Sequence, residues 1–412
     1  MYALSKQVNI CFGKMVLKLG ILIMAIAVFS LLFMSKYNYL SAQVLEGYIQ
    51  KDINVKEQSE YALFLLKNAW EIHLKEKYVG KSIKNIKEGI VYIQLNKKIN
   101  ARNIKINVAE VNRSINSKIE VFPQLATNEM HARAKIGNIA KDSDAILAIN
   151  GTYFKQKTGT PLGVLVIDKE IISGPIYDRV GFLINEDGFK TSKIGFEGVV
   201  KKDDLEVKID NINQPRLSKT QVLIYTEKWG NRSPEMKTKC KQMAIFDNKI
   251  VAISPYPLFI PVNGYVISAS EEKLKGFELG DEVYVDYTLT NCDFDYQHII
   301  SGGPYLMKEG KILVDAKEQK LVSITGRNPR TAIGYTKEND LIFVTVEGRK
   351  EGVSGVTLEE LAQIMKKLGC YEAINLDGGS STVMYVNGKT YNGSNLEGSV
   401  KISNALVVKV RS

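Results

Sequence analysis

A glycine-rich polar turn follows the apolar run 373–376 and begins with a carboxylate. The turn consists of Asp377, Gly378, Gly379, Ser380, Ser381 and Thr382. A carboxylate at the end of a buried strand can act as a base, a nucleophile or an electrostatic stabiliser, and glycine lets a ligand approach the backbone closely. The other interpretation is a hairpin turn that Asp377 caps. This turn is longer and more polar than a hairpin requires, which favours an active site.

Three further clusters place small residues beside polar ones at the edge of an apolar run. The first contains Asn150, Gly151 and Thr152, the second Ser301, Gly302 and Gly303, and the third Arg330, Thr331, Glu347 and Arg349. Glycine-rich turns expose N–H groups that can hold an anion, and guanidinium groups match phosphate oxygens. Two carboxylates near a glycosidic bond are the usual groups for hydrolysis at an anomeric carbon. The clusters together indicate a site for a sugar and an anion, although each arginine could instead form a surface ion pair.

Several other chemistries lack their sequence signatures. The chain has no GxxxxGK[ST] loop for phosphate binding and no G-x-S-x-G elbow for a serine nucleophile. Its three histidines are not spaced as metal ligands, and a serine–histidine triad that uses His298 is disfavoured. Its four cysteines contain no CxxC motif, so free thiols are expected. We therefore predict neither a metal nor a cofactor.

Two helix–strand units position the polar turns. A helix is predicted over about 128–140, followed by the strand 145–149 that ends at Asn150. A second helix is predicted from Thr357, which forms a capping box with Glu360, and it leads to the strand 373–376. This shared layout suggests an internal pseudo-repeat. Because residues 163–300 alternate apolar runs with turn signals, the predicted fold class is α+β, a β-rich domain with a few packed helices.

The segment 15–35 is predicted to be a transmembrane signal anchor. Residues 19–34 are uncharged and almost wholly apolar, and about 20 such residues span a bilayer as a helix. Lysines precede the segment, so residues 1–14 are predicted to be cytoplasmic and the rest extracytoplasmic. A cleaved signal peptide is the alternative, but Leu40 occupies a position where cleavage needs a small residue. The predicted location is the cell membrane, with a single pass.

Basic charge is concentrated near the N-terminus. The net charge is +10, and residues 1–102 carry 15 basic and 7 acidic side chains, against 40 and 38 in residues 103–412. Residues 36–88 are predicted to form a basic stem that includes an amphipathic helix over 58–78, and residues 89–412 to form the main domain. The near-neutral domain argues against nucleic acid as a partner. The stem could contact anionic lipid or wall polymer, or be a solvated linker.

Motifs in the main domain resemble those of the phosphodiester glycosidase family. The sequence AINGTYF at 148–154 is similar to the family's A-I-N-G-G-[FY]-F, and SGGPYL at 301–306 to G-G-P-x-L. RTAIG at 330–334 is similar to R-T-A-[IV]-G, EGR at 347–349 to D-G-R, and NLDGGSST at 375–382 to N-L-D-G-G-G-S-[SA]-T, with a closing NAL at 404–406. These elements follow the family order over about residues 90–410. Three departures are Thr152 in place of glycine, Glu347 in place of Asp, and one glycine fewer after Asp377.

The resemblance implies hydrolysis of a sugar-1-phosphodiester at the anomeric C–O bond. It assigns Asp377 as nucleophile, base or electrostatic stabiliser and Glu347 as second carboxylate. Arg330 and Arg349 would hold the phosphate, while Asn150 and the glycine turns would hold the sugar. For an exported protein the expected substrate is a cell-envelope glycan or phosphate-linked polymer.

Two alternatives remain open at the level of the sequence. One is a non-catalytic polysaccharide-binding or exopolysaccharide-assembly protein. The other is a glycosidase that acts on a non-phosphorylated glycan, in which case the arginines would be structural.

Overall fold

The computed structural model describes residues 55–236, 239–392 and 400–412. The chain divides into two compact units, Met1–Glu76 and Lys77–Ser412. Helix α3 (Val55–Lys77) confirms the helix predicted over 58–78. The predicted anchor at 15–35 lies outside the described residues. Within the part of the chain that the structure describes, no helix has the length and apolar character needed to cross a bilayer.

The second unit is built mainly from antiparallel strands, and this confirms the β-rich α+β prediction. It contains the helices α4 (Ile136–Asp142) and α5 (Leu358–Lys367), with the 3-10 turns η1 (Val322–Ile324) and η2 (Gly379–Ser381). The first strand already begins at Ile83, before the predicted domain boundary at residue 89. Cys240, Cys292 and Cys370 are free thiols, as expected.

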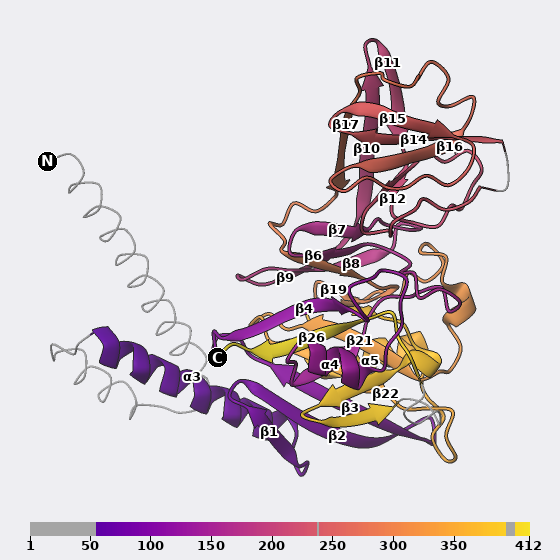
Figure 1. The fold of residues 1–412 in the computed structure, drawn as a ribbon. Helices are drawn as coiled ribbons and strands as arrows, with labels where there is room; N and C mark the ends of the chain where they lie inside the picture. The colour runs from indigo at the N-terminus through magenta and orange to yellow at the C-terminus, as the bar shows by residue number, and fades with distance from the viewer. Residues whose placement is uncertain (1–54, 237–238, 393–399) are drawn as a thin grey trace, which may run out of the picture. The chain divides into compact units, whose positions relative to one another are not determined.

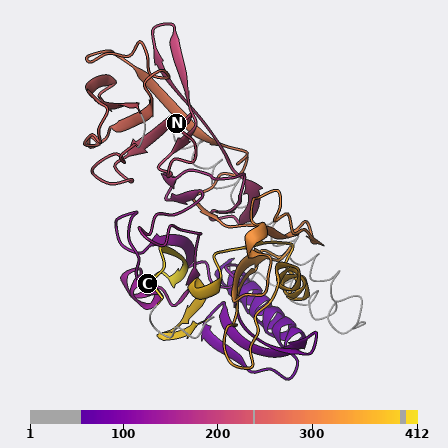
Figure 2. The same cartoon turned by 90° about the vertical axis from the view of Figure 1, so that its right-hand side faces the viewer.

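The largest sheet of the described residues has eight strands, which come from residues 83–111 and 305–375. Its order is β1 (Ile83–Lys87), β2 (Ile90–Ile99), β3 (Arg102–Val111), β22 (Leu341–Val346), β21 (Arg330–Tyr335), β23 (Glu372–Asn375), β19 (Tyr305–Lys308) and β20 (Lys311–Ile312). Strand β3 pairs with β22 so that Ile106 lies opposite Val346. Figures 1 and 2 both show this join, with indigo strands beside yellow ones.

The described residues of the unit also form four smaller sheets. One contains β25 (Lys389–Asn392), β24 (Val383–Val386), β5 (Leu147–Asn150), β26 (Asn404–Val410) and β4 (Ile119–Leu125) in that order. A second contains β7 (Glu170–Ser173), β6 (Leu165–Ile167), β18 (His298–Ser301), β8 (Val180–Ile184) and β9 (Phe189–Lys193). The third contains β12 (Asn211–Ile212), β13 (Leu223–Thr226), β16 (Tyr265–Ser270), β14 (Cys240–Phe246) and β15 (Lys249–Ser254), and the fourth β11 (Leu205–Ile209), β10 (Gly195–Lys202) and β17 (Tyr284–Thr290).

One apolar core connects the sheets that carry the polar turns. Ile149 of β5, Ile300 of β18, Ile374 of β23 and Leu406 of β26 belong to the same buried cluster. Each fully buried aliphatic side chain contributes about 1.5–3 kcal/mol relative to its exposed state. This shared core fixes the ends of β5 and β23, where the candidate site lies.

The two predicted helices differ in how well the sequence defines them. The Thr357 side chain accepts a bond from the Glu360 N–H, and the Glu360 side chain accepts one from the Thr357 N–H, so the predicted capping box is confirmed. The predicted helix over about 128–140 is wrong at its start, because α4 begins only at Ile136. Ala134 instead exchanges backbone hydrogen bonds with Ile402, at 3.0 and 2.9 Å, and this bridge holds the chain extended. His131 therefore does not lie on a helix.

Candidate active site

The ends of β5 and β23 meet, which brings together polar clusters more than two hundred residues apart. The Asn150 amide nitrogen donates to the Asp377 carbonyl oxygen at 2.6 Å. The Asn150 side-chain oxygen accepts from the Thr331 hydroxyl at 2.6 Å and from the Val383 N–H at 3.1 Å. Because Asn150 is only 1% exposed, its polar atoms tie three strand ends together.

Asp377 begins the turn at this meeting point. Its backbone N–H donates to the Gly151 carbonyl at 3.1 Å, and its carboxylate accepts from the Gly378 N–H at 2.9 Å. Burial raises the pKa of the Asp377 carboxyl to about 6, while hydrogen bonds from Ser381 and Gly378 and the charge of Arg179 act in the opposite direction. The group is half-buried at the surface of the turn. It is thus ionised at neutral pH but accepts a proton far more readily than an exposed aspartate.

Tyr153 and Arg179 also belong to this cluster, although neither was predicted to be a site residue. The Tyr153 hydroxyl donates to the Gly303 carbonyl at 2.9 Å and accepts from the Asn375 amide at 2.8 Å. The Arg179 guanidinium lies 4.9 Å from the centre of the Tyr153 ring. Burial, with the nearby charge of Asp377, raises the pKa of the Tyr153 hydroxyl, so this group stays protonated.

The turn of Ser301, Gly302 and Gly303 packs against the end of β23. The Gly303 N–H donates to the Asn375 carbonyl at 2.7 Å. A Cβ at Gly302 would lie 2.2 Å from that carbonyl oxygen, and Gly303 has a φ of +122°. Glycine is therefore required here for close approach of two backbones, which is a structural role beside the predicted substrate contact.

The departure at Thr152 has a local explanation in Asn404. The Asn404 side chain accepts from the Thr152 N–H at 3.0 Å and donates to the Thr152 hydroxyl at 2.8 Å. A Cβ at Gly151 would lie 2.0 Å from the same Asn404 oxygen. The closing NAL element thus secures the first polar cluster, and the threonine adds a hydrogen bond to that contact.

The two predicted phosphate-binding arginines differ in their surroundings. Arg330 is 2% exposed, and its guanidinium donates to the carbonyls of Val356 at 3.2 Å, of Ile324 at 2.6 Å and of Gly326. These inward-facing carbonyls need donors, so this arginine holds the 324–326 loop. Arg349 is exposed and donates to the Asn328 side chain at 2.6 Å. Its guanidinium lies against the turn after Asp377, since a Cβ at Gly379 would be 3.3 Å from Nη2.

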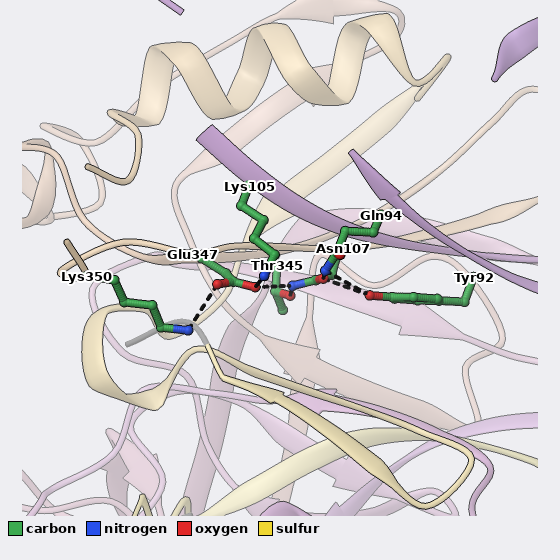
Figure 3. A network of polar contacts seen from close by, with 7 residues as sticks. All are labelled: Tyr92, Gln94, Lys105, Asn107, Thr345, Glu347 and Lys350. Carbon is green, nitrogen blue, oxygen red and sulfur yellow. Dashed lines mark hydrogen bonds and ion pairs between the residues drawn. The ribbon is translucent and has the colours of Figure 1, made fainter. Parts of the chain in front are cut away.

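The carboxylate of Glu347 lies in a separate polar network (Figure 3). It is 4% exposed and pairs with the ammonium groups of Lys105 at 3.4 Å and Lys350 at 3.0 Å. The Asn107 amide also donates to it at 3.4 Å. Strand β21 separates β22, which precedes Glu347, from β23, which precedes Asp377. The structure thus does not join Glu347 to the hydrogen bonds around Asp377, and its role as second carboxylate stays a prediction.

Comparison with known proteins agrees with the motif resemblance. Residues 241–409 match the family model described as phosphodiester glycosidase. These residues are similar to a phosphodiester glycosidase domain. The bovine N-acetylglucosamine-1-phosphodiester alpha-N-acetylglucosaminidase is 31% identical over 104 residues, which are 23% of this chain and 20% of that protein. The SPbeta prophage-derived uncharacterized protein YomE of Bacillus subtilis is 33% identical over 90 residues, 22% of this chain and 14% of that protein.

The fold extends beyond the part that matches the family model. A hypothetical protein from Synechocystis has a crystal structure that covers 80% of this chain and 64% of its own, with a TM-score of 0.75 and 24% identity. Within the phosphodiester glycosidase match lie Arg330, Glu347 and Asp377, whereas Asn150, Tyr153 and Arg179 precede it. The candidate site therefore combines residues inside the family match with residues that precede it. The sequence matches span only about a fifth or less of the curated relatives.

Proposed function

We propose that this chain hydrolyses the anomeric C–O bond of a sugar-1-phosphodiester. The proposal rests on the carboxyl of Asp377, which lies where the ends of β5 and β23 meet. Its pKa is raised to about 6. Arg179 and Arg349 supply positive charge near the turn. The family match supports a glycosidase, and the name of the bovine relative supplies a first substrate to try.

The reaction needs little from the protein besides charge stabilisation. Water adds to the anomeric carbon and gives up a proton to Asp377 or to solvent, and the phosphate monoester leaves with the electron pair of the broken C–O bond. The transition state is oxocarbenium-like, so an ionised Asp377 can stabilise it or attack it. A phosphate monoester departs readily as an anion, so strong general-acid help is unnecessary. The position of Glu347 among lysines is compatible with such a mechanism.

The buried amides have a positioning role in this proposal. Asn150 fixes the Asp377 backbone through its carbonyl, and Asn375 fixes the Tyr153 hydroxyl. Thr331 completes the Asn150 contacts. Half-buried Ser380 and exposed Arg349 are left to face a substrate, whereas Ser381 and Thr382 are buried.

We also propose that the domain acts outside the cytoplasm, held by the segment 15–35 as an uncleaved anchor. The support is the uncharged apolar run 19–34 and the lysines that precede it. The substrate would then be a cell-envelope glycan or a phosphate-linked polymer.

The test is hydrolysis by the purified full chain in mild detergent. Its substrates are the methyl phosphodiester of N-acetylglucosamine-1-phosphate and a neutral 4-nitrophenyl glycoside of the same sugar. Asp377→Asn is compared with Asp295→Asn, a control at an aspartate whose side chain is 86% exposed. We expect phosphodiester turnover that only Asp377→Asn abolishes.

Each other outcome points to a different function. Equal rates in both variants would remove Asp377 from the mechanism. Turnover of the neutral glycoside alone would favour an ordinary glycosidase. Polysaccharide binding without turnover of either compound would favour the non-catalytic alternative.

A further inference from the structure

Arg179 is a buried cation with unused hydrogen-bond donors. It directly precedes β8 and is 8% exposed, and its Nε and Nη1 atoms are buried without a hydrogen-bond partner. Among the described residues no carboxylate lies within 4.0 Å of its guanidinium. Arg216, by contrast, donates to the Gln221 carbonyl and, at 2.7 Å, to the Ser268 carbonyl. A buried guanidinium that lacks partners opposes folding, so a ligand is the expected reason for it.

The surroundings of Arg179 direct this guanidinium toward the site. Its central carbon lies 4.9 Å from the Tyr153 ring centre and 5.7 Å from that of Tyr177. The Tyr153 hydroxyl bonds to Gly303 and to Asn375, which is the last residue of β23. The Asp377 turn begins two residues later. The ammonium of Lys320 lies 4.7 Å from the centre of the Tyr177 ring. Arg179 thus contacts both rings, and its charge acts on the Asp377 carboxyl.

We propose that Arg179 binds the phosphate of the substrate and so makes the site selective for an anionic leaving group. This inference rests on the proposed function and names the phosphate-binding group of that same site. Arg330, the arginine expected from its motif, already donates to three carbonyls. Arg179 has the free donors, and its planar face is held against Tyr153. Charge-assisted hydrogen bonds from such a group stabilise the phosphate oxygens as the C–O bond breaks.

The experiment compares two substrates in variants of the full chain. Arg179→Met should lower kcat/KM for the phosphodiester by about 10²–10³-fold, as loss of one preorganised donor does elsewhere. The neutral 4-nitrophenyl glycoside should change by less than about threefold, because it carries no phosphate. Arg179→Lys should restore part of the phosphodiester activity, since it keeps the charge but not the planar fork. An equal loss on both substrates would overturn the proposal.

Thermal unfolding separates the binding role from a structural one. The Tm of Arg179→Met should equal or exceed that of the unchanged chain, because the guanidinium lacks hydrogen bonds in the fold. Arg216→Leu is the matched control and should lower the Tm by several degrees, because it removes donors from two backbone carbonyls. A clear drop in Tm for Arg179→Met would assign Arg179 to the fold instead.

A binding measurement keeps this inference distinct from the proposed function. Inorganic phosphate is titrated into the unchanged chain and into Arg179→Met by calorimetry. Loss of phosphate binding in the variant supports the inference even if no tested phosphodiester is turned over. Equal binding by both proteins, or no binding by the unchanged chain, overturns it.

Discussion

Asp377 has a pH dependence that follows from its surroundings. Burial raises the pKa of its carboxyl to about 6, so the ionised form grows in as the pH rises through that value. If the ionised form is the reactive one, kcat/KM should rise about tenfold per pH unit below 6 and level off above it. Asp377→Asn should lose about 10²–10⁴-fold at pH 7.5, the usual range for a proton-transfer or charged catalytic group. Steady-state rates from pH 4.5 to 8 test this, and an acid limb centred near 4 would contradict it.

The raised pKa of Asp377 also predicts how the stability of the fold changes with pH. The folded carboxyl has a pKa of about 6 against an ordinary value of 3.8 for aspartate, so the folded state binds the proton more tightly. The free energy of unfolding should therefore fall as the pH rises between these two values, because the native state binds more protons there. Asp377→Asn cannot ionise, so it should gain stability over the unchanged chain at pH 7.5 and lose that advantage near pH 4. Urea unfolding at both pH values measures the difference, and a less stable variant at pH 7.5 would refute it.

At the residue scale, the motifs located Asp377 and Asn150 but not Arg179. A polar turn after an apolar strand is visible locally, and Tyr153 lay inside a recognised motif without being singled out. No local sequence pattern distinguishes Arg179. Its distinguishing property is that two of its buried nitrogen atoms lack hydrogen-bond partners in the fold. Arg330 was assigned to phosphate because its motif is local, whereas the carbonyl of Val356 that it contacts is 26 residues away.

At the scale of elements, Asn150 offers a test of positioning against direct sugar contact. Asn150→Ala would leave the Thr331 hydroxyl, the Val383 N–H and the Asp377 carbonyl without this partner. Each buried group that loses its partner costs about 1–3 kcal/mol. We expect a loss of about 2–5 kcal/mol in urea unfolding, by the same principle, together with a lower kcat. A raised KM at unchanged stability would instead support the predicted contact between Asn150 and the sugar.

The elements with strong local signals were predicted well. The capping box of α5 and the strands β5 and β23 follow from local sequence, and the structure confirms them. The start of α4 was misplaced because Ala134 bridges to Ile402, a partner 268 positions away. Local periodicity carries no information about such a bridge, so a tertiary contact decided the helix boundary.

At the scale of the whole molecule, the order in which the strands pair could not be predicted from the sequence. Strand β3 lies beside β22, although the chain between them builds most of the other sheets. Strand β22 is an apolar run and β3 alternates apolar with polar residues, and either could pair with many neighbours, so their register depends on the common core. The convergence of Asn150 with Asp377 depends on the same packing, which is why the sequence predicted two similar strand ends but not their contact.

Membrane attachment is the remaining prediction at this scale. The full chain should stay in the membrane pellet after alkaline carbonate extraction, keep its full mass of 46.1 kDa, and expose a C-terminal epitope tag on intact cells or spheroplasts. Substituting Ile23→Arg together with Val28→Arg should release the protein from the pellet, because each arginine at the centre of a bilayer helix costs about 2.5–3.5 kcal/mol. Lys67→Arg, outside the apolar run, serves as the matched control. A shorter mature protein would indicate cleavage, and a tag protected from added protease until the membrane is opened would reverse the predicted orientation.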